Sequence, residues 1–472
     1  MNINIKKREV MVMLPTSLNY QDLEKVGKKS VPNFDLNIVK FILGRILFSS
    51  VIYNQATDTQ NYCNHSRISR NFWVKHIGST KYKAYINLLL NLKIINRSPY
   101  SEDKGECFGY GLTKPYRFSR IFCEVIPLKT AENLKVKATK TSYVKKYEKP
   151  LIDFFDNTRF SVDTEVVENL VFKDYFSVSA FPIEYSHGNP TKQGLAAYSN
   201  YLMAIKKMVK FMNGIYSFSR AHRKTGKEYK TYSRFYNPFA FLNKEIRANM
   251  YYDNKKLHEI DIKNSIPYFL SNYLGAMRMR ITKKRLKRVS DSFGIYMNSE
   301  SLKIALNTEV EDFKNLCISG KIYDEFIERL MVLYGDDWKT VYEREFSKKY
   351  SDSYEKNREL AKKLFLAMLF AKISQYKIVQ QAFGERFPLI FDLLTVQKKQ
   401  GYKNISKKLF EMEAFVVVDN IAKELIKEHK REVPVFTIHD SIATFEECKE
   451  LVLDKFNDTF FKFYGNTPTV TA

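Results

Sequence analysis

Two short runs of β-branched and aromatic residues near the end of the chain limit the folds open to this sequence. The runs span residues 435–438 and 442–445, and His439, Asp440 and Ser441 separate them. Two such runs joined by a short polar link predict a β-hairpin. The hairpin would carry Asp440 at its tip, where a carboxylate can bind a metal ion. The alternative is a plain hairpin in which Asp440 accepts hydrogen bonds from turn amides.

A second carboxylate lies in a stretch with strand periodicity. Residues 257–262 alternate polar and apolar, as a half-buried strand does, and Asp261 lies near the end of this stretch. Residues 263–265 and Pro267 then predict a turn into a helix. A side chain at the edge of a strand, beside exposed turn amides, is well placed to hold a metal ion.

A third stretch, residues 358–370, predicts an uninterrupted helix because it has no Gly or Pro and consists mostly of good helix formers. Arg358, Lys362, Leu366 and Phe370 are four residues apart and follow one slowly rotating face of this helix. The face offers two cations for a triphosphate and two apolar side chains for a base or sugar. The alternative is an amphipathic helix whose cations reach into solvent.

The charge balance predicts a polyanionic partner. The 472 residues include 77 Lys and Arg against 52 Asp and Glu, a net charge of +25, and nucleic acid is the partner that best explains this excess. A compositional bias towards Lys, Asn, Ile and Tyr is the alternative explanation. The hydrophobic content of 44% indicates a globular protein with an ample core.

Several classes of protein are not expected. The sequence has no run of eighteen apolar residues and no signal-peptide pattern at its start, so we expect no membrane association and an intracellular, cytoplasmic protein. Five scattered cysteines without a C-x-x-C pair indicate neither a zinc ribbon nor a disulfide framework. We also expect a monomer.

Residues 1–125 predict an N-terminal domain of the winged helix-turn-helix kind. From residue 66 the order is helix, helix, strand, a glycine-containing loop and a returning strand, which we expect at residues 115–118. A small helical packing module with surface lysines is the alternative. The cations available for phosphates are Arg67, Arg70, Lys81 and Lys83.

The middle of the chain predicts contacts to nucleic acid. Residues 126–160 are rich in Lys and are expected to be a basic linker, whereas residues 161–250 are expected to be a thumb-like helical region. Basic residues interleaved with aromatic ones in residues 220–236 suit a nucleic-acid track, because cations meet phosphates while rings stack on bases. An exposed surface loop is the alternative. The residues predicted to bind nucleic acid are Arg220, Arg223, Lys224, Arg234 and Arg247, together with Lys283 and Arg285 in a second basic run.

In chain order, these three stretches resemble motifs A, B and C of the family A DNA polymerases and the phage-type single-subunit RNA polymerases. Motif A corresponds to residues 257–270, motif B to residues 358–371 and motif C to residues 433–447. The Arg-x-x-x-Lys spacing, followed eight residues later by an aromatic residue, matches motif B. His-Asp-Ser at the hairpin tip is similar to the RNA polymerases, whereas family A DNA polymerases usually have His-Asp-Glu. The segment SGKIYDEF, residues 319–326, resembles an element commonly found between motifs A and B.

The resemblance implies an α+β, mostly helical, right-hand polymerase fold, with residues 251–472 forming palm and fingers. It implies nucleotidyl transfer in which two metal ions, Mg²⁺ or alternatively Mn²⁺, hold the attacking 3′-oxygen and the leaving pyrophosphate. The implied catalytic residues are Asp261 and Asp440 as metal ligands, with Arg358 and Lys362 on the triphosphate. The implied nucleotide-binding residues are Arg358, Lys362, Phe370, Ile266 and Ser265, and His439 is expected near the primer terminus.

Two departures leave the sugar of the product open. Family A DNA polymerases have a Glu where this chain has Ile266, which favours RNA synthesis. Both families usually have Tyr-Gly where this chain has Phe370 and Ala371, and the absence of the tyrosine hydroxyl favours DNA synthesis or poor discrimination. The chain also has no room for a proofreading exonuclease of usual size.

The main hypothesis is therefore a compact, template-directed polymerase that adds nucleoside triphosphates to a 3′ end. The expected template is DNA, the product is RNA or DNA, and a phage or plasmid-like mobile element is the expected setting. The second hypothesis is a non-catalytic winged-helix protein that binds DNA as a replication initiator or regulator. A third is a degenerate polymerase fold retained for binding alone.

Overall fold

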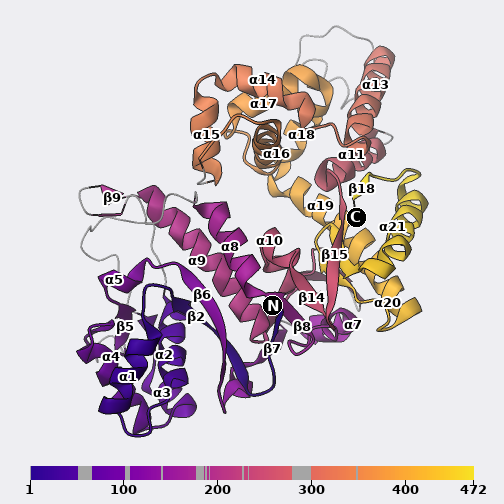
Figure 1. The fold of residues 1–472 in the computed structure, drawn as a ribbon. Helices are drawn as coiled ribbons and strands as arrows, with labels where there is room; N and C mark the ends of the chain where they lie inside the picture. Colours follow the sequence, from indigo (N-terminus) through magenta and orange to yellow (C-terminus); the bar gives the residue numbers. More distant parts are fainter. Residues whose placement is uncertain are drawn as a thin grey trace. The chain divides into compact units, whose positions relative to one another are not determined.

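The computed structural model describes residues 2–50, 66–100, 107–139, 142–176, 185–186, 189–190, 192–225, 228–231, 233–278, 299–346 and 349–471. The fold is α+β and mostly helical, with small sheets, as the sequence predicts (Figure 1). No helix in the described ranges is long and apolar enough to cross a membrane.

The chain divides into two compact units, which are described separately. Unit 1 comprises Met1–Ala138, Phe155–Ser217 and Phe241–Leu257. Unit 2 comprises Thr139–Phe154, Phe218–Ala240 and His258–Ala472. Each unit is therefore assembled from three separate stretches of the chain, and this division differs from the domain boundaries predicted from the sequence.

A two-stranded antiparallel ribbon organises the core of unit 1. It pairs β2 (Glu9–Pro15) with β6 (Ile121–Pro127), and almost every residue of β2 is buried. Helix α2 (Leu36–Ser49) packs on β2 at Gly44, where an added Cβ would lie 2.8 Å from the Cβ of Val12. The missing side chain therefore lets helix and strand approach closely.

After α2, the chain follows the predicted order of helices and strands, with one difference. The elements are β3 (Ser66–Arg67), α3 (Arg70–His76), α4 (Lys81–Asn91), β4 (Ile95–Ser98) and β5 (Gly109–Leu112), and the strands form a sheet in the order β3-β5-β4. The returning strand is thus β5. The prediction of a strand at residues 115–118 is wrong, because Pro115 starts the short helix α5 (Lys114–Arg117) with its ring at a first-turn position.

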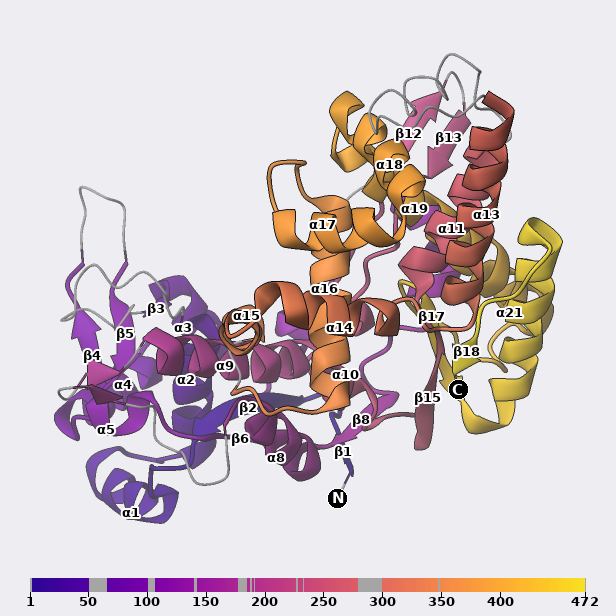
Figure 2. The same cartoon turned by 90° about the horizontal axis from the view of Figure 1, so that it is seen from above.

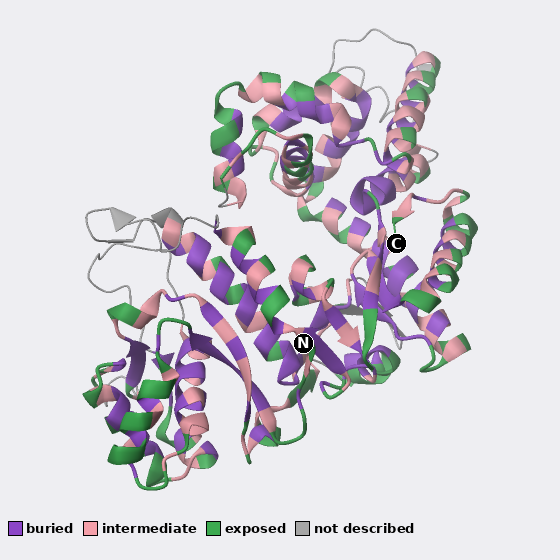
Figure 3. Ribbon diagram, viewed as in Figure 1, coloured by how far each residue is buried: buried purple, intermediate pink, exposed green. Residues whose placement is uncertain are grey.

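The remaining elements of unit 1 are two long helices and short strands. Helix α8 (Thr164–Tyr175) begins at Asp163, whose side chain accepts the N–H of Val166, and it packs against α9 (Lys192–Met212). Their inward faces are buried (Figure 3). The other elements are β1 (Asn2–Asn4), α1 (Tyr20–Ser30), η1 (Ala131–Leu134), β7 (Val136–Thr139), β8 (Phe160–Asp163), β9 (Tyr185–Ser186), β10 (Asn189–Pro190), β11 (Ile215–Phe218), α10 (Lys244–Arg247) and β14 (Met250–Tyr252). The short helix η2 (Phe239–Phe241) contains the chain boundary between the two units.

The stretch predicted to be a basic linker, residues 126–160, is structured over most of its length. Besides η1 and β7, it contains the two short helices α6 (Ser142–Tyr147) and α7 (Lys149–Ile152). Glu148, between these helices, is fully buried. A buried carboxylate requires a partner, and Glu148, which belongs to unit 2, finds one in Arg220 of the same unit.

Unit 2 contains a small sheet backed by helices. In this sheet β17 (Ser441–Phe445) lies between β16 (Phe436–Ile438) and β15 (Lys255–Ile262), and β18 (Val470–Thr471) pairs with the other edge of β15. The helices near the sheet are α11 (Ser265–Arg278), α13 (Ser299–Ile318), α19 (Lys403–Ala414), α20 (Lys423–His429) and α21 (Lys449–Tyr464). The π-helix η3 (Phe415–Ala422) joins α19 to α20, η4 (Glu446–Cys448) precedes α21, and β12 (His222–Thr225) pairs with β13 (Glu228–Thr231).

A second group of helices in unit 2 surrounds an aromatic core. It comprises α14 (Asp324–Tyr334), α15 (Asp337–Phe346), α16 (Tyr354–Phe370), α17 (Lys377–Arg386) and α18 (Pro388–Gln400), seen together in Figures 1 and 2. Helix α16 contains the predicted helix and starts where Ser353 accepts the N–H of Lys356. The rings in its core include Phe313, Phe326, Phe365, Phe383 and Phe387.

A buried acid in unit 1 makes a prediction about stability and pH. Glu168 on α8 is 8% exposed and accepts the N–H of Cys123 at 2.6 Å. Burial raises the pKa of the Glu168 carboxyl from 4.5 to about 7, against the opposing effects of the Cys123 N–H and the Arg120 guanidinium. Between these two pKa values the folded state holds a proton that the unfolded state has lost.

We therefore expect the free energy of unfolding to contain a component that decreases as the pH rises from 4.5 to about 7. Replacing Glu168→Gln should remove this component, so that the variant gains stability relative to the wild type towards pH 8. Urea unfolding at a series of pH values measures it. Glu165→Gln, at an exposed position of the same helix, should keep the wild-type slope. An unchanged slope in the Glu168→Gln protein would contradict the prediction.

Candidate active site

The predicted hairpin is present, and its tip has an uncommon backbone conformation. Strands β16 and β17 pair with Ile438 opposite Ser441, so His439 and Asp440 alone form the turn. His439 adopts a φ of +57°, a left-handed conformation that tight hairpin turns require and that residues other than glycine rarely adopt. Its ring meets the Tyr236 ring edge-on at 5.5 Å between centroids.

Asp261 lies on strand β15, and Asp440 lies in the turn that leads into the neighbouring strand β17. Strand β15 is hydrogen-bonded to β17, and the Ser441 hydroxyl donates to the Glu259 carboxylate at 2.7 Å. Asp261 lies two residues beyond Glu259 on the same face of β15, and Asp440 directly precedes Ser441. The sheet therefore places Asp261 and Asp440 on neighbouring elements, a strand and the turn beside it.

Asp440 is surrounded by groups from several elements of unit 2. Burial raises the pKa of the Asp440 carboxyl, and the charges of Arg234 and Lys362, its own backbone N–H and the Ser265 hydroxyl oppose the rise. Arg234 comes from the segment before β15, Ser265 starts α11, and Lys362 lies on α16. Two cations and a hydroxyl that are distant in sequence thus favour the ionised form of one carboxylate.

Two of the cations of α16, Arg358 and Lys362, lie over one tyrosine ring. The Arg358 guanidinium carbon and the Lys362 Nζ are 5.6 and 5.9 Å from the centroid of the Tyr323 ring. Arg358 also donates to the Asp324 carboxylate at 2.8 Å and to the Gly320 carbonyl at 3.1 Å. Residues 319–326, which resemble an element between motifs A and B, therefore support the cations of the predicted motif B.

Glu413 on α19 is part of this cluster, and the sequence analysis missed it. It is fully buried, and it accepts bonds from the Arg234 Nε at 2.5 Å, the Arg234 Nη2 at 2.7 Å and the Ser265 hydroxyl at 3.3 Å. Burial raises the pKa of the Glu413 carboxyl to about 7, while Arg234 opposes the rise. Its signal in the sequence is an acid on the apolar face of a helix, three residues after Phe410 and four before Val417.

The residues predicted to bind the nucleotide have three different environments. Ser265 donates to the Glu413 carboxylate and favours the ionised form of Asp440. Phe370 is half-buried and packs edge-on against Phe410 at 5.5 Å between ring centroids. Ile266 is only 7% exposed, at the start of α11.

Arg220, predicted to bind nucleic acid, is instead an internal anchor. It is 3% exposed and donates to Glu148 at 2.9 Å, to both carboxylate oxygens of Asp419 at 2.8 Å and to the Ser233 carbonyl at 2.8 Å. Lys423 joins the same acids, at 3.2 Å from Glu148 and 3.0 Å from Asp419. The donors of Arg220 are turned inward, so its guanidinium is unavailable to a phosphate.

The other residues predicted to bind nucleic acid are distributed as follows. Arg234 is paired with Glu413, and Arg247, in unit 1, donates to the Leu242 carbonyl at 2.6 Å. Lys283 and Arg285 lie outside the described residues, as do the side chains of Arg223 and Lys224 on β12.

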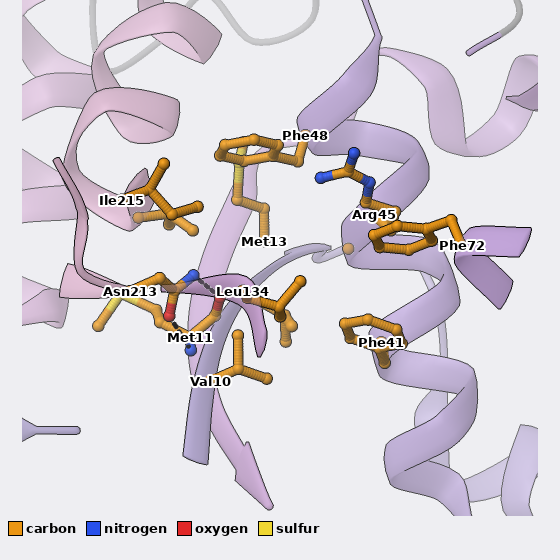
Figure 4. A pocket seen from close by; sticks show the side chains of 13 residues that line it. Val10, Met11, Met13, Phe41, Arg45, Phe48, Phe72, Leu134, Asn213 and Ile215 are labelled. Atoms are coloured by element: carbon orange, nitrogen blue, oxygen red, sulfur yellow. Dashed lines mark hydrogen bonds between the residues drawn. The ribbon is translucent and has the colours of Figure 1, made fainter. Parts of the chain in front are cut away.

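Two further observations limit where a ligand can bind. Within the described ranges, no group of three or more His, Cys, Asp or Glu residues is placed to hold a metal ion. An apolar cavity in unit 1, beside Arg45 and Phe72, has a volume of about 40 Å³ (Figure 4). This is room for a few water molecules and not for a nucleotide.

Comparison of the chain with known proteins gives no information on the function of this cluster. No protein-family model matches the chain, and no match was found among the curated proteins or the solved structures. Its function has to be argued from the geometry.

The Arg220 network makes a prediction about stability. Replacing Arg220→Met leaves the buried Glu148 and the partly buried Asp419 with Lys423 as their remaining partner, so we expect the free energy of unfolding to fall by about 3–5 kcal/mol. Urea or guanidinium unfolding measures the loss, and Arg431→Met, at an exposed position of the same unit, is the matched control. A loss below about 1 kcal/mol, as for a surface ion pair, would show that the network is not a structural anchor.

Proposed function

We propose that unit 2 carries the active site of a template-directed nucleic-acid polymerase, which adds nucleotides to a 3′ end by a two-metal mechanism. The observation that carries the proposal is the setting of Asp440. Asp440 lies in the turn before β17, the strand next to the one that carries Asp261, and the charges of Arg234 and Lys362 favour its ionised form. Two carboxylates on neighbouring elements of a sheet, under the influence of nearby cations, suit the transfer of a phosphate-linked group.

The donor set fits magnesium. Asp261 and Asp440 offer hard carboxylate oxygens, and Mg²⁺ is typically held by one or two protein carboxylates together with substrate phosphates and water. Two acids are therefore enough, and a cluster of three protein ligands is not required. A bound Mg²⁺ pair would orient the attacking 3′-oxygen and neutralise charge on the leaving pyrophosphate. Mn²⁺, with similar oxygen preferences, is the alternative ion.

The cations of α16 have distinct proposed roles. Lys362 is exposed and makes no ion pair with any described residue, so its ammonium can bind a triphosphate. Arg358 is tied to Asp324 and Gly320, so it supports the triphosphate end of the site from a fixed position. Ile266, Ser265 and Phe370 are proposed to line the place of the sugar and base, and His439 to contact the primer terminus.

The resemblance to polymerase motifs completes the proposal. It suggests a palm, fingers and thumb arrangement, a DNA template, nucleoside triphosphate substrates, and a role for a phage or plasmid-like mobile element. The sugar of the product stays open, because Ile266 favours RNA whereas Phe370 favours DNA.

A second function is supported by unit 1, where the proposed winged helix would bind duplex DNA. The order β3, α3, α4, β4, β5 with sheet order β3-β5-β4 is typical of winged helix-turn-helix domains, in which the second helix of the turn enters the major groove. Lys81 and Lys83 are exposed at the start of that helix, α4. Arg67 has another task, since it donates to the carbonyls of Pro99 and Cys107 at the two ends of the predicted wing.

The polymerase proposal predicts the loss of activity in two variants. Asp261→Asn and Asp440→Asn should each lower Mg²⁺-dependent nucleotide incorporation by about a hundredfold or more, because each removes a metal-binding oxygen from the displacement. Extension of primed and unprimed DNA and RNA templates, with ribonucleotides and deoxyribonucleotides tested separately, measures it and also reveals the sugar preference.

The control for this experiment is Asp454→Asn, at an exposed position of α21, which should retain wild-type incorporation. Incorporation that survives in both the Asp261→Asn and Asp440→Asn proteins would refute the proposed active site. Duplex binding that persists in the same inactive variants would be expected, because it belongs to unit 1.

The winged-helix proposal predicts a salt-dependent effect. The double change Lys81→Ala and Lys83→Ala should weaken duplex binding and reduce the slope of log affinity against log salt by about 0.9 for each phosphate that the protein no longer neutralises. Fluorescence anisotropy at several salt concentrations measures the slope. Lys28→Ala with Lys29→Ala on α1 removes the same charge from an exposed site and should leave the slope unchanged. Equal effects of the two pairs would argue against a specific role for α4.

A further inference from the structure

The Arg234 guanidinium is fixed on two sides. Glu413 accepts from its Nε and Nη2, and the ring of Phe410 lies 4.0 Å below its central carbon. Glu413 and Phe410 are three residues apart on α19, so one helix face supplies both contacts. The Arg234 side chain is 17% exposed and that of Glu413 is fully buried, so solvent barely screens this pair.

Arg234 has a second potential partner, Asp440. Tyr236, two residues after Arg234, packs edge-on against His439, which directly precedes Asp440, and the charge of Arg234 favours the ionised form of Asp440. A planar guanidinium pairs with a carboxylate through two parallel bonds and so occupies both oxygens. Magnesium requires the same oxygens, since it binds carboxylates directly. A bidentate Arg234–Asp440 pair would therefore compete with metal binding.

Ser265 links the two acids. Its hydroxyl donates to Glu413 at 3.3 Å and also favours the ionised form of Asp440. A serine hydroxyl has one proton, so it serves one carboxylate at a time. With Arg234 on Glu413, the two oxygens of Glu413 are satisfied without any demand on Asp440.

We propose that Glu413 is a positioning residue that engages Arg234 and thereby reserves the Asp440 oxygens for a divalent metal ion. This inference rests on the proposed function, because it presupposes that Asp440 binds metal. It assigns Glu413 itself no metal ion, since both its oxygens are bound by Arg234 and Ser265. Glu413 acts in this role only by engaging Arg234, so removing Arg234 should reverse the effect of losing Glu413.

The experiment measures Mn²⁺ binding to the full chain by electron paramagnetic resonance, without nucleic acid or nucleotide. Glu413→Gln frees Arg234 to pair with Asp440, so we expect Mn²⁺ affinity to fall by about 10- to 100-fold, as for other residues that orient a metal ligand. Adding Arg234→Met to this variant removes the competitor. The double variant should return to within about threefold of wild-type affinity, a non-additive result.

Arg234→Met alone provides a route that does not depend on the folding of the Glu413→Gln protein. It removes a positive charge beside Asp440, so Mn²⁺ should bind at least as tightly as in the wild type. A purely structural role for the ion pair predicts weaker binding in all three variants. The matched control is Glu411→Gln, half-buried on the same helix, which should bind Mn²⁺ like the wild type. Thermal melting checks that each protein is folded.

The outcomes separate this inference from the proposed function. Wild-type protein that does not bind Mn²⁺, or that binds it equally well with Asp440→Asn, overturns both. Wild-type binding that disappears with Asp440→Asn but is unchanged by Glu413→Gln overturns the role of Glu413 alone. A double variant as weak as the Glu413→Gln protein, or weakened binding in Arg234→Met, also overturns it.

Discussion

Two arginine–carboxylate pairs on one helical rod, each with one fully buried partner, are the interactions on which unit 2 depends. Arg234 binds Glu413 and Arg220 binds Asp419, each through two bonds, and the acids lie on α19 and η3 of a continuous helix. A buried charge without a partner is strongly unfavourable, so each arginine fixes where its segment meets the rod. The segment between Phe218 and Ala240 is thereby held beside the hairpin that carries Asp440.

The helical rod is shaped for these two contacts. Residues six apart in a regular α-helix face different sides, because each residue turns the chain by about 100°. Between Glu413 and Asp419 the chain changes from α-helix to the π-helix η3, a rare form that often occurs at functional sites. The Asn420 side chain donates to the Phe415 carbonyl at 2.7 Å and satisfies an acceptor there. The change in winding thus lies where the rod has to present acids to two arginines.

Local patterns predicted the hairpin, the strand before Asp261 and helix α16, because alternation, turn residues and helix formers act over a few neighbours. The same reasoning failed at residues 115–118, where Pro115 starts a helix, and in residues 126–160, where Glu148 is buried by contacts from far along the chain. Glu413 was missed, and Arg220 and Arg234 were assigned to nucleic acid, for a related reason. The partner of a buried charge depends on tertiary contact, which residue spacing does not encode.

The burial of Arg220 and Arg234 changes how the net charge of +25 should be interpreted. Both arginines are paired with acids within the fold. Because such a pair has no net charge, the total of +25 is unchanged, but it is carried by surface lysines and not by these two arginines. At physiological ionic strength a charge acts over about 8 Å, so a large total charge attracts a polyanion without positioning it. Positioning requires a cation at the site itself, and Lys362 is exposed and close enough for its charge to favour ionised Asp440. The proposed active site therefore depends on one lysine of α16 more than on the overall excess of basic residues.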